Sequence, residues 1–418
     1  MQHRVGVEAL ALAVPHRFLD LEDLARARGI DPAKFTQGLG AKQMAVPDPG
    51  EDAPALAATA AKRALAASGI DVSRIGMVIV GTETGVDHSK AVASYVQGML
   101  KLPRTVRTFD TQHACYGATA ALHTAAQWIA SGASHGKAAL VVGADLARYG
   151  LKTVGEPTQG GGAVAMVVSD SPDLLELDFG VSGVDSLDVH DFWRPVGRRE
   201  ALVDGHYSIR CYLDALTASY TDWKQQALSR ELVRKGDTLV SEQLARIAYH
   251  VPFCKMARKA HAQLRRVDLQ ERRGGKAWDE QAEAEEAPKL AASFETQVAP
   301  TLPISARVGN AYTASLYLGI ASMLNLQAPS LVGKRVGLFS YGSGCTSEFF
   351  SAVVADKAVA RIAAANIEDI LAARERIDVE EYERLMGLAS DAPLPTAPAP
   401  GTFRLEKIQE GRRIYAAG

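Results

Sequence analysis

Long apolar runs and cysteines are both scarce in this chain of 418 residues. No stretch approaches the roughly 18 apolar residues of a membrane helix, and the N-terminus lacks the apolar core and cleavage site of a secretion signal. The four cysteines (Cys115, Cys211, Cys254 and Cys345) form no CxxC pair, which argues against a disulfide framework and a structural zinc site. We therefore expect a cytoplasmic protein with free thiols, no bound metal and no membrane segment.

The chain also lacks an excess of charge of either sign. Its 46 Lys and Arg nearly balance 48 Asp and Glu, for a formal net charge of -2. Such a balance gives no overall field that would draw the protein to nucleic acid or to a membrane surface, so an anionic ligand must meet a local basic cluster. With 47% apolar residues, the chain is long enough for two or three domains or for one duplicated fold.

Short apolar runs that end in small or polar residues alternate with alanine-rich stretches of helical character. Strands are predicted at 75–84, 137–149, 161–170 and 334–345, and helices at 53–70 and 118–132. This alternation predicts an α/β protein with buried, mainly parallel strands.

A weak internal repeat connects the two halves of the chain. Strand ends and helix starts recur in the same order: Glu83, Cys115 and 143–145 in the first half, and His250, Asn310 and 342–343 in the second. In two packed βαβ halves the strand ends meet at one place, beside which ligands bind. We therefore expect the side chains at these positions to be neighbours.

The repeat suggests a first half at 1–170 and a second half at 171–418. The interval from strand end to helix start is 60 residues in the second half against 32 in the first, and the charged segment 267–290 has the right length to be the insertion. We expect it to be a solvated helical excursion. The proline-rich segment 391–400 predicts a non-helical linker, and the alternating segment 403–415 predicts an edge strand.

Two residues of the first half have the character of a nucleophile and its base. Cys115 lies between an alternating strand and an alanine-rich helix, where the helix dipole and free N–H groups favour a thiolate. The alternative is an ordinary buried cysteine. Glu83 follows a buried strand, where partial burial raises a carboxyl pKa toward that of a general base; the alternative is a plain loop acid.

In the second half, His250 ends an apolar strand, and a cationic run follows it. Lys255, Arg258 and Lys259, with 265–266 further on, are the best local candidates for binding a phosphorylated ligand. The alternatives are a hydrogen-bonded core histidine and a solvated helix face.

Asn310 and Ser343 lie in turns of small residues suited to hydrogen-bonding a carbonyl or thioester, although either could simply cap a helix. The glycine cluster GGGAV at 160–164 lacks the spacing of a phosphate-binding loop and is weak evidence for nucleotide binding.

Six motifs in order, GTETGVDHSK, ACYGATAAL, DFWRP with SIRCYLDAL, HVPFCKMARKAH, VGNAYTASLYLG and LFSYGSG, closely resemble the hydroxymethylglutaryl-CoA (HMG-CoA) synthase family. The resemblance covers essentially the whole chain and is weakest in 267–290. The family is a branch of the thiolase superfamily, which implies a thiolase-like duplicated five-layer αβαβα fold.

By this resemblance the protein condenses acetyl-CoA with acetoacetyl-CoA, without a cofactor beyond these thioesters, as a homodimer that supplies the mevalonate pathway. Cys115 matches the acetylated nucleophile, Glu83 the general acid/base and His250 the residue that polarises the ketone. The matching supporting and substrate-binding positions are Tyr116, Asp145, Thr158, Asp191, Lys255, Asn310, Tyr312 and Ser343.

Three other functions stay open at this point. An enzyme of polyketide β-branching would perform the same chemistry on an acyl carrier protein, although HVPFCKMARK resembles the CoA-using group more. Ketoacyl synthesis or thiolysis generally pairs the cysteine with two histidines or with a histidine and a second cysteine, whereas this chain offers a glutamate. A non-catalytic acyl-binding subunit would not need the intact Glu, Cys and His set.

Overall fold

The computed structural model describes residues 4–198, 200–274, 278–388 and 399–418. Within these ranges nine strands form one mixed sheet. Their order across the sheet is β11 (Arg246–Tyr249), β12 (Arg335–Gly342), β13 (Thr346–Val354), β8 (Leu175–Ser186), β1 (Gly6–Ala13), β7 (Gly160–Ser169), β6 (Ala138–Ala147), β4 (Ile75–Gly81) and β5 (Arg107–Thr111).

The strand order shows the duplication that the sequence predicted. Counted along the chain within each half, the first half runs in the order 1-5-4-2-3 (β1, β7, β6, β4, β5) and the second in the order 1-4-3-2 (β8, β13, β12, β11), which is the order of the first half with its third strand left out. Among the described residues, only two pairs, Gly6 with Glu176 and Val7 with Leu175, join the two half-sheets through β1 and β8. The place of a third strand in the second half is taken by the helical segment that follows β11.

The prediction of mainly parallel strands is wrong. Of the eight neighbouring pairs in the described sheet, only β11 with β12, β4 with β5 and β4 with β6 are parallel. A buried apolar run indicates only that both faces of a sheet are covered. Here helices cover both faces of a sheet whose strands are mostly antiparallel, so the apolar runs did not reveal strand direction. Strand direction depends on the connection: β4 reaches β5 and β6 through helical crossovers, whereas β6 returns to β7 through a loop.

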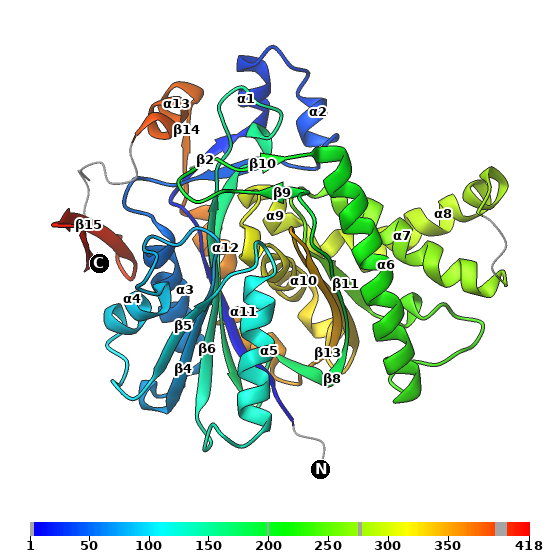
Figure 1. Ribbon diagram of the computed structural model, residues 1–418. Coiled ribbons are helices and arrows are strands. Elements are labelled where there is room, and N and C mark those ends of the chain that lie inside the picture. The colour runs from blue at the N-terminus through cyan, green and yellow to red at the C-terminus, as the bar shows by residue number, and fades with distance from the viewer. Residues whose placement is uncertain (1–3, 199, 275–277, 389–398) are drawn as a thin grey trace.

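Helices cover both half-sheets and fill the space between them (Figure 1). α3 (Ala53–Ser68) and α4 (Val92–Met99) lie outside the first half-sheet, α5 (Gly117–Ala130) and α10 (Ser315–Leu331) lie in the centre, and α6 (Gly205–Ser229) and α7 (Lys255–Arg272) lie outside the second. The central helices touch where the Thr119 and Tyr317 hydroxyls lie 2.9 Å apart. This is the expected five-layer thiolase-like arrangement.

Alanine and glycine explain how closely these layers pack. α3 is almost entirely buried, begins at the cap Asp52 and ends at Gly69, whose φ of 70° only glycine adopts freely. Its many alanines favour the helix and keep its surface thin enough to lie flat on β1 and β7.

Smaller elements surround the five layers. A three-stranded sheet contains β14 (Glu375–Ile377), β2 (Arg17–Asp20) and β3 (Gln43–Val46), and a small hairpin contains β9 (Phe192–Trp193) and β10 (Leu202–Val203). The remaining helices are α1 (Leu21–Ala27), α2 (Ala33–Thr36), α8 (Glu280–Gln297), α9 (Pro303–Val308), α11 (Ala358–Ala363), α12 (Ile367–Ala372) and α13 (Val379–Gly387).

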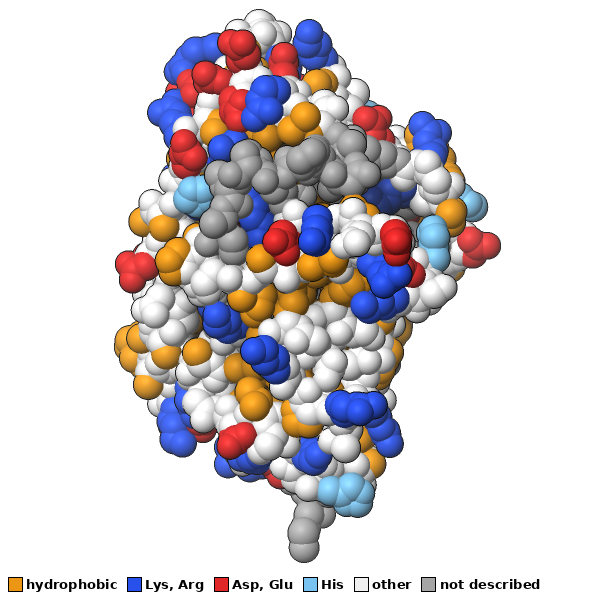
Figure 2. Space-filling model, turned by 90° about the vertical axis from the view of Figure 1, so that its left-hand side faces the viewer, with side chains coloured by type: hydrophobic (Ala, Val, Ile, Leu, Met, Phe, Trp, Pro, Cys, Tyr) orange, Lys and Arg blue, Asp and Glu red, His pale blue; other side chains and the backbone are white. Residues whose placement is uncertain are grey.

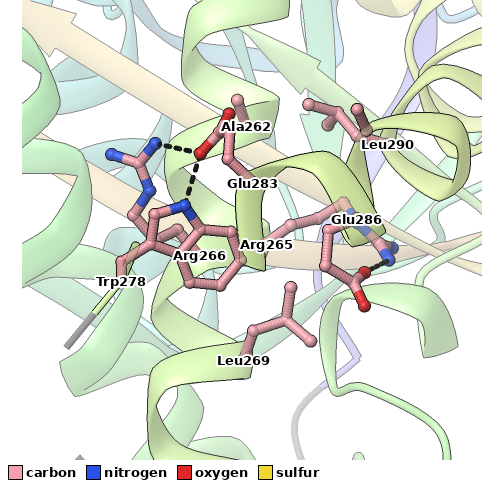
Figure 3. A pocket seen from close by; sticks show the side chains of 9 residues that line it. Ala262, Arg265, Arg266, Leu269, Trp278, Glu283, Glu286 and Leu290 are labelled. Carbon is pink, nitrogen blue, oxygen red and sulfur yellow. Dashed lines mark hydrogen bonds and ion pairs between the residues drawn. The ribbon is translucent and has the colours of Figure 1, made fainter. Parts of the chain in front are cut away.

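The charged segment 267–290 is helical, as predicted, but not simply solvated. It spans the end of α7 and most of α8, with 275–277 outside the described residues. Figure 3 shows a small cavity between these helices, where Glu283 accepts hydrogen bonds from Arg266 and Trp278. Arg265 is 3% exposed and pairs with Glu286 and with a carboxylate before β11. Arg265 is therefore buried in ion pairs and not free to bind phosphate, whereas Arg266 stabilises the helical hairpin and stays partly exposed.

The alternating tail forms its own hairpin, so the prediction of an edge strand is wrong. β15 (Phe403–Gln409) pairs only with β16 (Arg412–Ala417) in the described part of the chain, and the hairpin packs on α3. Alternation indicates a strand but not its partner, which here is supplied by a turn at 410–411. Of the predicted linker 391–400, residues 391–398 lie outside the described residues.

Figure 2 shows the face that carries the tail hairpin, where basic and acidic side chains are interspersed and crowd together at the upper end. Among the described helices, none combines the length and the apolar composition that crossing a bilayer requires.

Candidate active site

The N-terminus of α5 meets strand ends from both halves of the sheet. Gly81 ends β4, and a Cβ there would lie 2.2 Å from Ala118 N; Gly342 ends β12, and a Cβ there would lie 2.7 Å from Tyr116 N. Any larger residue at either strand end would push the helix away. The small residues that begin α5 are buried for the same reason.

Cys115 and Glu83 lie in contact at this junction. The Cys115 Sγ donates a hydrogen bond to Glu83 Oε1 over 3.5 Å. Both residues keep part of their surface accessible, so a ligand can reach them. Burial and the nearby Asp145 carboxylate raise the pKa of Glu83 to about 8, which suits a general base near neutral pH.

The expected helix-stabilised thiolate is not what the structure shows. α5 begins at Gly117, two residues after Cys115, and Ala114 before it has a φ of 40°. Burial, together with the carboxylates of Glu83 and Asp145, raises the pKa of the Cys115 thiol well above its usual value. The resting cysteine is therefore protonated, and its proton points to Glu83.

Asp145 is a fully buried carboxylate that organises the site. Its Oδ1 accepts hydrogen bonds from Glu83 N (2.9 Å), Thr84 N (3.0 Å) and Thr82 Oγ1 (2.9 Å), and its Oδ2 accepts them from Thr313 N (3.0 Å) and Thr313 Oγ1 (2.5 Å). The first group belongs to the loop after β4, whereas Thr313 belongs to the second half. Asp145 therefore fixes the main chain of Glu83 relative to the other half of the molecule.

His250 lies directly after β11. This strand pairs with β12, and the end of β12 packs on the segment before α5. Its N–H donates to Phe339 O over 2.7 Å, and its carbonyl accepts from the Tyr212 hydroxyl over 2.8 Å. The side chain is 3% exposed, and its Nδ1 has no hydrogen-bond partner among the described residues. Because burial lowers the pKa of His250 to about 3, the imidazole is neutral and can hydrogen-bond a ligand.

The polar side chains of Tyr149, Asn310 and Tyr312 lie together beside Cys115 and Glu83. The Tyr149 hydroxyl is hydrogen-bonded to Tyr312 and Asn310, and it interacts electrostatically with Cys115 and Glu83. Asn310 Oδ1 also accepts from Tyr312 N over 2.9 Å, which fixes the turn before α10. Tyr149 was missed in the sequence, although it is the last residue of the predicted strand at 137–149.

The DFWRP loop (residues 191–195) covers these side chains. The Asp191 carboxylate, fully buried, accepts from Tyr341 Oη (2.7 Å) and Gly344 N (2.9 Å), so it anchors the loop to the turn after β12. The Phe192 ring lies 5.9 Å from the Tyr312 ring. Arg194 donates a hydrogen bond to the Glu83 carbonyl. Arg194 belongs to the DFWRP motif, but no feature of the sequence distinguished it from its neighbours.

The remaining expected site residues are Tyr116, Thr158, Ser343 and Lys255, and no side-chain hydrogen bond among the described residues joins them to Cys115 or Glu83. Tyr116 precedes α5 and donates to Glu348 Oε2 over 2.7 Å, Thr158 hydrogen-bonds its own turn at Gly155, and Ser343 lies partly buried in the turn after β12. Lys255 is exposed at the start of α7.

A cavity of about 510 Å³ lies beside the loop that leads from Tyr149 to Thr158, and its lining includes Lys34 and Lys152. Neither lysine has an ion-pair partner in the described ranges. The segment after Lys34 reaches α7, where Leu39 O accepts from Lys255 N over 2.9 Å. Lys34, on α2, and Lys152, in a loop, thus line one cavity that could hold phosphate groups, and Lys255 lies at the start of α7. Only Lys255 was identified in the sequence, because the other two are isolated in it.

A partly exposed cysteine held against a glutamate at the strand ends of a five-layer αβαβα protein defines an acyl-transferring enzyme of the thiolase-like fold. Residues 1–173 match the family hydroxymethylglutaryl-coenzyme A synthase N terminal, and residues 175–395 match hydroxymethylglutaryl-coenzyme A synthase C terminal. The chain belongs to the HMG-CoA synthase family.

Relatives agree over nearly the whole chain. Hydroxymethylglutaryl-CoA synthase of Enterococcus faecalis is 35% identical over 93% of this chain and 92% of that protein. The solved structure of MvaS in complex with 3-hydroxy-3-methylglutaryl coenzyme A is 62% identical, with a TM-score of 0.97 and full coverage of both chains. The HMG synthase of the curacin biosynthetic pathway, solved in complex with an acetyl donor-ACP, is 30% identical, with a TM-score of 0.86 over 99% of this chain and 100% of that chain.

Proposed function

We propose that the protein forms HMG-CoA by condensing acetyl-CoA with acetoacetyl-CoA, using Cys115, Glu83 and His250. The observation that carries this proposal is the contact of 3.5 Å between the Cys115 sulfur and the Glu83 carboxylate, which joins a nucleophile to a base. Membership of the HMG-CoA synthase family supports the condensation reaction. The contact between the two side chains supports Cys115 as the nucleophile and Glu83 as the base.

The first half-reaction transfers the acetyl group to sulfur. As Cys115 Sγ attacks the carbonyl carbon of acetyl-CoA, its proton passes to Glu83, the group to which it is already hydrogen-bonded. The tetrahedral intermediate then expels CoA as its thiolate, which takes up the proton from Glu83, and the acetyl-Cys115 thioester remains.

The second half-reaction forms the carbon–carbon bond. Glu83, again a carboxylate, removes a methyl proton from the acetyl thioester, and the resulting enolate attacks the ketone carbon of acetoacetyl-CoA. The neutral imidazole of His250 hydrogen-bonds the alkoxide that develops on the ketone oxygen, and this alkoxide then takes up the proton that Glu83 removed from the methyl group. Water hydrolyses the thioester, releasing HMG-CoA and restoring the Cys115 thiol.

The remaining positions serve the substrates in this proposal. Asn310, Tyr312 and Ser343 surround the acceptor, with Thr158 nearby, and Tyr116, Asp145 and Asp191 hold the main chain of the site. Lys255, with Lys34 and Lys152 at the neighbouring cavity, supplies positive charge for the phosphates of CoA.

The acceptor is tested by supplying the acetylated enzyme with either acetoacetyl-CoA or an acetoacetyl-acyl carrier protein. We expect kcat/KM to be about tenfold or more higher for acetoacetyl-CoA, since losing even one good phosphate contact costs about 1.4 kcal/mol. Mass spectrometry of the product identifies the carrier.

The second candidate is the polyketide-type enzyme, which the structural likeness to the curacin synthase favours. A preference for the carrier protein in the same assay would establish it instead. The catalytic residues would be the same, because only the group that carries the acceptor differs.

We further propose that the protein is a cytoplasmic homodimer that supplies the mevalonate pathway and that its halves divide near residues 170 and 171. Four free cysteines support a reducing compartment. In the described sheet, β5 has a neighbour on one side only, and an open strand edge is a ready site for pairing with a second copy. Light scattering should give a native mass twice that of the chain; the mass of a single chain would rule out the dimer.

A further inference from the structure

Both peptide groups that flank Glu83 are held by charged side chains. Its N–H donates to the buried Asp145 carboxylate over 2.9 Å, and its carbonyl oxygen accepts a hydrogen bond from the Arg194 guanidinium. Asp145 reaches Glu83 from β6, in the first half-sheet, whereas Arg194 reaches it from the DFWRP loop. The direction in which the Glu83 side chain leaves the main chain therefore depends on both contacts.

Arg194 is itself well placed to act as a rigid contact. It directly follows β9, whose Trp193 pairs with Leu202 of β10, and this hairpin orients the residue. Asp191 ties the same loop to the turn after β12, and Phe192 packs on Tyr149 with ring centroids 6.5 Å apart. The loop thus has three separate attachments around the site.

The two contacts also oppose each other in charge. The Asp145 carboxylate raises the pKa of Glu83, and the Arg194 guanidinium lowers it. Without the Arg194 charge, only the hydrogen bond from Cys115 would offset burial and the Asp145 carboxylate, both of which favour the protonated form of Glu83.

We propose that Arg194 is a positioning residue for Glu83, which orients the carboxylate toward Cys115 and supplies the positive charge that keeps it available as a base. The inference rests on the proposed role of Glu83 in removing the methyl proton. Arg194 acts through Glu83 and need not touch the substrate.

The test compares Arg194→Gln, which keeps a hydrogen-bond donor but loses the charge, with Arg194→Lys, which keeps the charge. The quantity measured is kcat/KM for acetoacetyl-CoA as a function of pH, because in this two-step reaction it reports on the acetylated enzyme and the condensation. Arg198→Gln is the matched control, since Arg198 is exposed in the same segment. Acetylation of Cys115, followed by mass spectrometry, verifies that each variant is folded.

We expect the acidic limb of the profile to move upward by about one pH unit in Arg194→Gln. At each pH on this limb, kcat/KM of Arg194→Gln should then be about tenfold lower than that of the wild type. The limb should stay in place in Arg194→Lys and in Arg198→Gln. An unmoved limb in Arg194→Gln, whatever the loss in overall rate, overturns the role of Arg194. A wild-type limb that persists in Glu83→Gln instead overturns the role of Glu83, so the two failures are distinguishable.

Discussion

Replacing Cys115 with serine should lower the rate of HMG-CoA formation by on the order of 10⁴-fold and abolish acetylation of the enzyme. The serine hydroxyl would keep the position beside Glu83, but a hydroxyl is far less acidic than even the raised Cys115 thiol, and a carboxyl of pKa about 8 cannot activate it. Incubation with acetyl-CoA followed by mass spectrometry of the intact protein measures acetylation directly.

Cys211→Ser provides the control for this variant. Cys211 is also partly exposed, but it lies on α6, and its recorded hydrogen bond is to Tyr207. We expect acetylation and turnover close to wild type. Normal acetylation and turnover of Cys115→Ser would show that the sulfur is not the nucleophile and would remove the basis of the mechanism.

Replacing Glu83 with glutamine or alanine should leave acetylation possible but slower, because water must then take up the Cys115 proton, and should stop condensation, with a loss of about 10²- to 10⁴-fold in HMG-CoA formation. Neither side chain can take the methyl proton from the acetyl thioester. The acetyl-enzyme should therefore accumulate when both substrates are present, and mass spectrometry should detect acetylated Cys115 during turnover.

The pH dependence gives a second measure of the same residue. Because Glu83 must be ionised to act as a base, the wild-type rate of condensation should rise as the pH increases through the Glu83 pKa of about 8, and this limb should be absent in Glu83→Gln. Asp87→Asn, an exposed carboxylate on the same loop, should keep the limb. A glutamine variant that condenses at the wild-type rate would assign the proton transfer to another group.

The structure also explains why one part of the site was visible in the sequence and another was not. Glu83 and His250 follow short apolar runs, and Cys115 precedes an alanine-rich helix, so each was marked by its local pattern. Arg194 and Lys152 lie in loops of no regular pattern, and their positions depend on how those loops fold back over the strand ends.

Several errors have a shared physical origin. The mixed strand directions, the separate tail hairpin and the ion pairs that occupy Arg265 all depend on which distant segment lies alongside. Periodicity reports whether a residue faces the core, but not which partner it meets there. The protonated state of Cys115 is of the same kind, since it follows from burial and from carboxylates brought in by β4 and β6.

The sequence by itself determined the α/β class, the duplication, the buried strands and helices, and the family to which six ordered motifs belong, because these depend on local periodicity and on residues close together in the chain. Only the tertiary structure decided that the Cys115 proton points to Glu83, that Asp145 and Arg194 hold Glu83 from opposite sides, and that His250 is neutral. Those properties depend on burial and on charges brought together from distant segments, and a proton's affinity for a group is set by that surrounding field.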